Sequence, residues 1–143
     1  MEQISSSQKD SFFIFDERMC QMHSIHPDKE TGEVKYNCPE VPERTRSIYT
    51  YLKGEGLLNH MGQIELGELT PQVIDYLEQE VLPLCHSKEF VAEVKERCAK
   101  LAENETEGDQ KHDMYYASGS YHASLLSLLA AVKGVKAIMN QEY

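Results

Sequence analysis

Apolar side chains recur at helical spacing in four parts of the chain, and three of these parts follow a recognisable helix start. Pro42 suits the first turn of a helix, Thr70 is a capping residue followed by proline, and Ser87 caps a later run. The pattern therefore predicts four helices, over about 42–54, 71–81, 88–101 and 120–140.

Two short apolar runs predict strands. The run Phe12–Phe15 is rich in aromatic residues and ends at an acidic pair, which is typical of a buried strand, and 63–66 forms a second candidate. The stretches 19–39 and 103–111 are polar or broken by proline and glycine, so they are expected to be loops. Residues 1–10, with three consecutive serines, are expected to be disordered.

The helix expected over 120–140 is apolar on nearly every face, because it carries the run Leu125, Leu126, Leu128, Leu129, Ala130, Ala131 and Val132. A helix of this kind is normally buried on several sides. The three other helices and two short strands barely supply that cover. Residues 120–140 are therefore expected to meet a further surface, either the rest of a larger domain or a protein partner.

Composition narrows the class of protein. The 143 residues fit one domain. The net charge of −10 disfavours binding to nucleic acid or to an anionic membrane, and we expect no apolar run long enough to span a bilayer. The four cysteines follow a polar N-terminus rather than a signal peptide, which favours a cytoplasmic or nuclear protein with reduced thiols.

Candidate metal ligands occur early in the chain. Cys20, His23 and His26 have the spacing C-x2-H-x2-H, and Cys38 follows. These are zinc ligand types, but structural zinc sites usually combine two close pairs of ligands, and Cys38 stands alone. The favoured interpretation is a loop with scattered histidines and a buried cysteine, without a metal.

Nucleophilic catalysis has no complete motif here. Cys85 and His86 are adjacent, and adjacent side chains rarely face each other as a catalytic dyad does. The sequence contains no G-x-S-x-G, P-loop or G-x-G-x-x-G motif. Tyr115, Tyr116 and Tyr121 either frame a binding surface or lie at the edge of the core.

Four stretches, in this order, resemble the N-terminal part of zinc-dependent histone deacetylases of the class II type. They are FDERMCQMH (15–23), CPEVPERTRSIYTYLKGEGLL (38–58), CHSKEFVAEVK (85–95) and DMYYASGSYHASLLSLLAAV (113–132). The resemblance implies an α/β fold, the N-terminal portion of an arginase/deacetylase-like domain over residues 11–143. This portion should be helix-rich, with about four helices and one or two short strands of a parallel sheet.

The resemblance also implies a chemistry. Family members hydrolyse acetyl-lysine with a zinc ion held by two aspartates and a histidine, and a histidine pair acts as acid and base. The family's G-H-H motif is expected after the apolar helix, and the sequence reaches Tyr143 without it. This chain is therefore expected to hold no catalytic residue, no metal ligand and no cofactor. It would be inactive alone, as a fragment, a short isoform or a degenerate paralogue, and whether it is an enzyme stays open.

One family feature falls within the sequence, an aspartate at the rim of the substrate tunnel that binds the substrate backbone. Asp113 is the nearest candidate, although alignment without a gap from Tyr115 places His112 at that position. The prolines before the helix at 42 would fix the end of a rim loop. Arg44 or Arg46 is expected to tie that loop to a carboxylate, with Arg44 as the favoured residue.

Two other functions remain open. The chain could be a helical interaction module that docks through residues 120–140, or a small zinc-binding protein that uses the cysteines and histidines between 20 and 38. An acetylated-lysine protein is the substrate that the family resemblance implies.

Overall fold

The computed structural model describes residues 11–25, 31–33, 41–103, 105–109 and 114–140. Its elements, in chain order, are β1 (Phe12–Phe13), α1 (Glu17–Met22), α2 (Pro42–Gly54), β2 (Gly62–Gln63), α3 (Pro71–Tyr76), α4 (Lys88–Lys100), β3 (Thr106–Asp109), β4 (Met114–Ala117) and α5 (Ser120–Met139). The helix-rich α/β class is confirmed, although the described residues form five α-helices rather than about four. The expected disorder of residues 1–10 lies outside the described residues.

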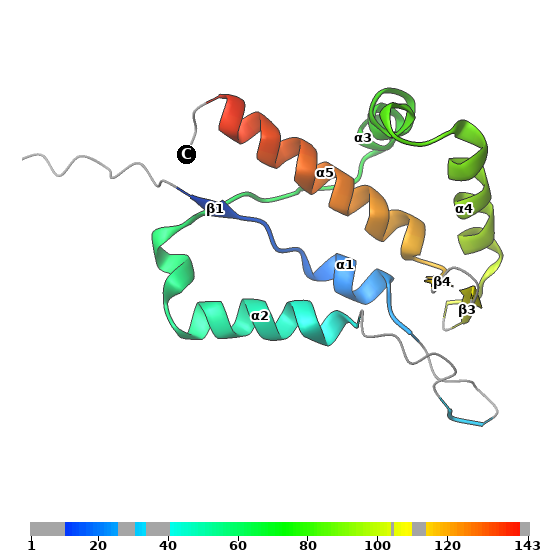
Figure 1. The fold of residues 1–143 in the computed structure, drawn as a ribbon, viewed down its shortest axis with the longest axis horizontal. Coiled ribbons are helices and arrows are strands. Elements are labelled where there is room, and N and C mark those ends of the chain that lie inside the picture. The colour runs from blue at the N-terminus through cyan, green and yellow to red at the C-terminus, as the bar shows by residue number, and fades with distance from the viewer. Residues whose placement is uncertain (1–10, 26–30, 34–40, 104, 110–113, 141–143) are drawn as a thin grey trace, which may run out of the picture.

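Helix α5 is the centre of the fold. Figure 1 shows α1 and α2 on one side of it and α3 and α4 on the other, and both α1 and α4 contact it directly. The fully buried side chains are Leu77, Leu125 and Leu126. Two of these three belong to α5, so this helix contributes most to the core, as its apolar pattern predicts.

The first two strands form a parallel pair. Phe12 lies opposite Gly62 and Phe13 opposite Gln63, and the amide of Gly62 donates to the carbonyl of Ser11 at 2.8 Å. Each strand is two residues long: β1 lies within the predicted run Phe12–Phe15, whereas β2 shares only Gln63 with the predicted stretch 63–66. Helix α5 lies close to β1, since a Cβ at Gly134 would be 3.4 Å from the ring of Phe12.

The predicted helix starts are confirmed. Pro42 is the first residue of α2, the hydroxyl of Thr70 accepts a hydrogen bond from the Val73 amide, and the hydroxyl of Ser87 accepts one from the Phe90 amide. These caps satisfy amides that have no partner within the helix. Gly56 follows α2 in a left-handed conformation, with φ of 72°, which favours glycine.

Three expectations about regular structure are wrong. Part of the stretch 19–39 is helical, because Asp16 caps α1 by accepting from the Arg18 amide. Part of the stretch 103–111 is strand β3, which pairs antiparallel with β4. The second predicted helix ends as an α-helix at Tyr76 and continues as a π-helical segment, Leu77–Val81, followed by a 3-10 turn, Leu82–Leu84.

Helix α5 is long and apolar enough to cross a membrane by length and composition alone, with a mean hydropathy of 1.3 over its best window. The expectation that no run is long enough is therefore wrong by this criterion. A helix that forms the core of a folded domain has the same composition. In this fold Leu125, Leu126 and Leu129 are buried against the other elements, but only 33% of the window is buried, so core packing accounts for part of the apolar pattern.

Candidate functional site

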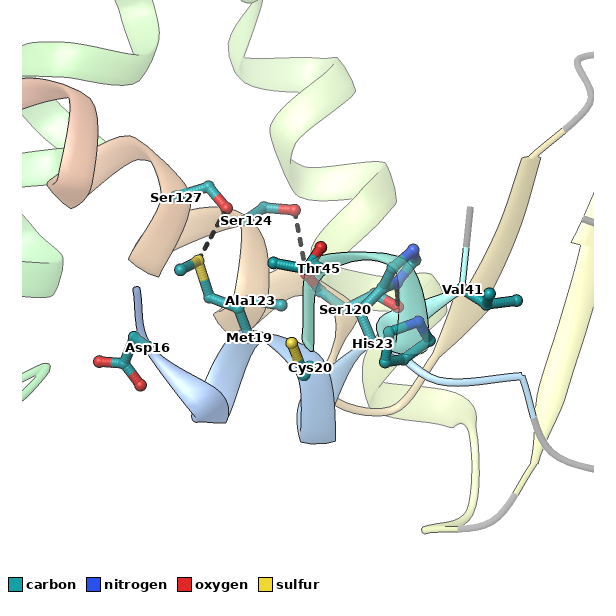
Figure 2. Close-up of a pocket in the computed structure, with 11 residues that line it drawn as sticks. Asp16, Met19, Cys20, His23, Val41, Thr45, Ser120, Ala123, Ser124 and Ser127 are labelled. Carbon is teal, nitrogen blue, oxygen red and sulfur yellow. Dashed lines mark hydrogen bonds between the residues drawn. The ribbon is translucent and has the colours of Figure 1, made fainter. Parts of the chain in front are cut away.

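A pocket of about 600 Å³ lies where α1, the start of α2 and the start of α5 meet (Figure 2). We call this region the helix junction. The side chains that line it are those of Asp16, Met19, Cys20, His23, Val41, Pro42, Thr45, Ser120, Ala123, Ser124 and Ser127. They come from three of the four stretches that carry the family resemblance.

His23 and Ser120 connect α1 to α5. Figure 2 shows the imidazole and the hydroxyl pointing toward each other, with Nδ1 and Oγ 2.6 Å apart. The Ser120 oxygen already accepts from the Ala117 amide at 2.8 Å. We therefore assign its hydroxyl as the donor to Nδ1, which places the imidazole proton on Nε2. The His23 ring stacks on Tyr115, with centroids 4.4 Å apart.

The imidazole of His23 is held neutral by its surroundings. Burial lowers the pKa of His23, since an imidazolium ion loses its hydration in this position. Tyr115 is 7% exposed and Ser120 is 6% exposed, so both partners belong to the interior. The arrangement joins two elements and keeps the histidine uncharged.

Gly119 allows α1 and α5 to approach each other at the helix junction. A Cβ at this position would lie 2.5 Å from the carbonyl oxygen of Met22 and 2.9 Å from its Cα. These are backbone atoms, which cannot turn aside as a flexible side chain can. Gly119 and Ser120 stand at the start of α5, directly after strand β4 and its turn. The structure shows that Gly119 provides space for α1, and that Ser120 binds the turn at Ala117 and the histidine of α1.

The sulfur atoms at the helix junction are not nucleophilic. Burial raises the pKa of the Cys20 thiol, and Glu17 adds to the effect, so the thiol stays protonated near neutral pH. The Met19 sulfur accepts a hydrogen bond from the hydroxyl of Ser127 at 3.3 Å. Ser124 donates to the backbone carbonyl of Ser120 at 2.9 Å. These groups stabilise the contact between α1 and α5.

Arg46 in α2 connects that helix to α1. Its Nε donates to Glu17 at 2.7 Å, and its Nη1 lies 3.3 Å from Glu43. These bonds raise the pKa of Arg46, so the guanidinium is always charged. Of the two arginines expected to bind a carboxylate, Arg46 does so within the described residues, and its partner Glu17 lies in α1. The expected loop partner of Arg44 lies outside the described contacts.

A second charged pair fixes the start of α1. Arg18 Nε donates to Asp16 at 2.9 Å, and Arg18 Nη2 donates to the carbonyl of Gly67 at 2.7 Å. The hydrogen bonds from Arg18 outweigh the effect of burial and lower the pKa of Asp16. The Asp16 carboxylate lines the pocket, but its charge is balanced by Arg18, so it is poorly suited to act as a base.

A further polar cluster lies on the other side of α5. The hydroxyl of Tyr121 and the ammonium of Lys95 each donate to Glu78 at 2.7 Å. Burial opposes ionisation of Glu78, but these two hydrogen bonds outweigh it and lower its pKa. Burial and the bond to Glu78 raise the pKa of Tyr121. Glu78 lies in the π-helical segment, so this cluster joins that segment to α4 and α5.

The other candidate residues are placed as follows. Cys20 and His23 both line the pocket, whereas His26 and Cys38 lie outside the described residues. Within the described ranges, no three His, Cys, Asp or Glu side chains gather closely enough to hold a metal ion. Zinc binding by the stretch 20–38 stays a prediction.

Asp113 and His112, the two candidates for the tunnel rim, also lie outside the described residues. Their role is untested.

The Cys85–His86 pair forms no dyad in the structure. His86 instead lies beside Phe90, with ring centroids 5.4 Å apart, and Cys85 is exposed. Of the three tyrosines considered as a binding surface, Tyr115, Tyr116 and Tyr121 are all less than 9% exposed. They are therefore part of the core.

Sequence reasoning missed the contacts that build the helix junction. Ser120 and His23 are 97 positions apart, and Arg46 and Glu17 are 29 positions apart. Periodicity describes one element at a time, so it cannot pair residues at such distances. The available signal was the resemblance, because both Ser120 and His23 lie in stretches that carry it.

Comparison with known proteins identifies one family. A family model described as the histone deacetylase domain matches residues 38–143, which is more than half of the chain. No curated protein and no solved structure matches the chain.

Proposed function

The chain belongs to the histone deacetylase family, and we propose that it forms the N-terminal part of a class II lysine-deacetylase domain. The match over residues 38–143 carries this proposal. It includes the stretches 38–58, 85–95 and 113–132, and the remaining stretch, 15–23, ends at the histidine that binds Ser120. An acetylated-lysine protein in the cytoplasm or nucleus is the substrate we propose, with Asp113 as the candidate for binding its backbone.

For these 143 residues alone we propose that hydrolysis of acetyl-lysine does not occur. In the family, zinc would act as the Lewis acid that polarises the acetyl carbonyl. The donors that the described residues bring together do not fit such an ion, because no three of them gather. The sequence also contains no adjacent pair of histidines to act as acid and base.

The role we assign to the helix junction is structural. His23 Nδ1 already accepts from Ser120, Cys20 is protonated and Asp16 is bonded to Arg18, so each of these groups is engaged in a contact within the fold rather than presented to a substrate. Together they hold α1 and α2 against α5. In a deacetylase domain, this arrangement would support the loops around a substrate tunnel.

Two measurements test the proposal. First, the purified protein is incubated with zinc and a fluorogenic acetyl-lysine peptide. We expect no turnover above a metal-free control, and turnover that a hydroxamate inhibits would refute the proposed inactivity.

Second, the chain is co-expressed with the C-terminal part of a class II deacetylase domain, beginning at its G-H-H motif. We expect a soluble complex whose deacetylase activity is inhibited by a hydroxamate. The Gly119→Ala chain, which disturbs the helix junction, should give less complex. A folded complex without inhibitor-sensitive activity would contradict the assignment to a deacetylase domain.

A second candidate function is an interaction module, and one observation favours it. At the end of α5, the side chains of Val135, Ile138 and Met139 are 60%, 62% and 76% exposed. Apolar residues grouped at one end of a helix are typical of a docking surface. We expect a dye that reports apolar surface to bind, and Ile138→Glu to weaken that binding. A monomer that binds no dye would argue against this candidate.

A further inference from the structure

A hollow lies beneath the first turns of α4, against the first turns of α5. It has two adjoining parts, of about 240 Å³ and about 230 Å³. The residues that line both parts are Leu82, His86, Val91 and Tyr121. Because the two parts share these residues, we treat them as one site, the α4 groove, and its total size falls within the range of small-molecule sites.

One half of the α4 groove is apolar. The side chains of Phe90, Val94, Tyr116 and Leu125 line it, together with the exposed Met114. Phe90 is 45% exposed and Met114 is 44% exposed, so large apolar groups face solvent at its edge. This half suits a hydrocarbon chain or a ring, whose transfer from water is favourable.

The other half carries more basic than acidic side chains. Lys88, Lys95 and His86 line it, against the single carboxylate of Glu78. Glu78 is already bonded to Lys95 and Tyr121. No carboxylate within the described ranges pairs with Lys88. Because Lys95 is paired with Glu78, Lys88 is the one unbalanced charge among the described residues that line this half, and it favours an anionic group.

We propose that the α4 groove binds an amphipathic monocarboxylate, with its carboxylate near Lys88 and its apolar part among Phe90, Val94 and Leu125. The charge selects an anion over a cation, and the adjoining apolar half selects a ligand with a chain over a simple anion. Its apolar half includes Ser124, which also lines the pocket at the helix junction, so the two sites adjoin along α5.

Octanoate is the probe for a binding test with the full 143-residue protein. Isothermal titration calorimetry at low ionic strength should give saturable binding with a Kd on the order of 1 mM, which is ordinary for a ligand of this size. Acetate, which lacks the chain, and octylamine, which has the opposite charge, should bind at least about fivefold more weakly. Equal binding of octylamine would overturn the proposal.

A charge-reversal variant locates the carboxylate. Lys88→Glu should raise the Kd for octanoate about fivefold, as expected for reversing one exposed charge. Lys53→Glu in α2 makes the same change of net charge far from the groove, and should change the Kd by less than about twofold. Both variants should melt like the original protein. If the two variants changed the Kd equally, the net charge of the protein would explain the attraction for octanoate. The proposed site at Lys88 would then be wrong.

The apolar contact is located by amide chemical shifts. Octanoate should shift the amide signals of Phe90, Val94 and Leu125 more than those of Val135 and Ile138, the exposed end of α5. Shifts concentrated at the end of α5 would mean that the chain binds that apolar surface instead. That result, or titration without saturation, would refute a site in the α4 groove.

Discussion

Replacing Gly119 by alanine should disrupt the helix junction, and the geometry sets the size of the effect. The new Cβ would lie 2.5 Å from the Met22 carbonyl oxygen, a distance that real Cβ atoms essentially never show. Because the obstructing atoms belong to the backbone, α1 must move away from α5. Inserting a methyl group into a packed site costs about 1–3 kcal/mol, and the lower entropy of unfolded alanine offsets about 0.5 kcal/mol of this.

We therefore expect Gly119→Ala to lower the free energy of unfolding by about 1–2 kcal/mol. The matched control is Gly54→Ala, at the end of α2, where nothing lies within 4 Å of the added Cβ. That change should stabilise the protein by about 0.5 kcal/mol, because alanine has the higher helix propensity. With a urea m-value of about 2 kcal/mol/M, the two midpoints should differ by about 1 M.

Urea melts followed by far-ultraviolet circular dichroism and by tyrosine fluorescence would measure both variants, and coincident curves would support two-state analysis. A second readout addresses the mechanism. If α1 moves, His23 loses the contact with Ser120 and becomes more exposed, so its pKa should rise toward the ordinary value in an NMR titration of the folded protein. Equal midpoints for the two variants, with an unchanged His23 titration, would refute the close approach of α1 to α5.

Three further predictions concern named side chains. The pKa of His23 is lowered in the folded protein, so its contribution to stability should be complete above about pH 6.5 and should fall as the pH drops through the folded pKa. The variant His23→Gln should flatten this part of a curve of stability against pH. An unchanged curve would contradict the burial of the ring. Arg46→Lys should reduce stability because lysine lacks the planar guanidinium that reaches Glu17. A double-mutant cycle with Glu17→Gln should give a coupling energy that becomes smaller as the salt concentration rises. A coupling energy of zero would mean that the pair is only a solvated contact. Tyr121→Phe removes the hydroxyl that donates to Glu78 and should cost about 1 kcal/mol in a urea melt, whereas no cost would indicate that Lys95 alone satisfies the carboxylate.

The sequence predicts the helices well because their signals are local. Thr70 and Ser87 mark helix starts through hydrogen bonds to amides three residues later, and Pro42 marks one through its restricted backbone at the first helical position. The same argument explains one error. Asp16 is also a capping residue, but the helix it begins is only six residues long, too short for apolar periodicity to show.

The errors in the second helix and the hairpin have a different origin. The apolar spacing from Val73 to Val81 continues without a break, yet the backbone changes to a π-helical segment at Leu77. This segment contains Glu78, which bonds Tyr121 and Lys95, and tertiary contacts of this kind override local propensity. Strand β3 is likewise polar in sequence and is a strand because it pairs with β4.

Apolar periodicity cannot predict the candidate site, but the residues that form it lie in the stretches that resemble the family. Stretch 15–23 supplies His23, stretch 38–58 supplies Arg46, and stretch 113–132 supplies Ser120. These three segments meet at one junction of the fold, where His23 binds Ser120 and Arg46 binds Glu17. Segments that are distant in sequence and resemble one family in the same order are therefore also joined by direct contacts. The family match covers two of the three stretches, 38–58 and 113–132, and the contacts of His23 and Glu17 join the third stretch, 15–23, to both of them.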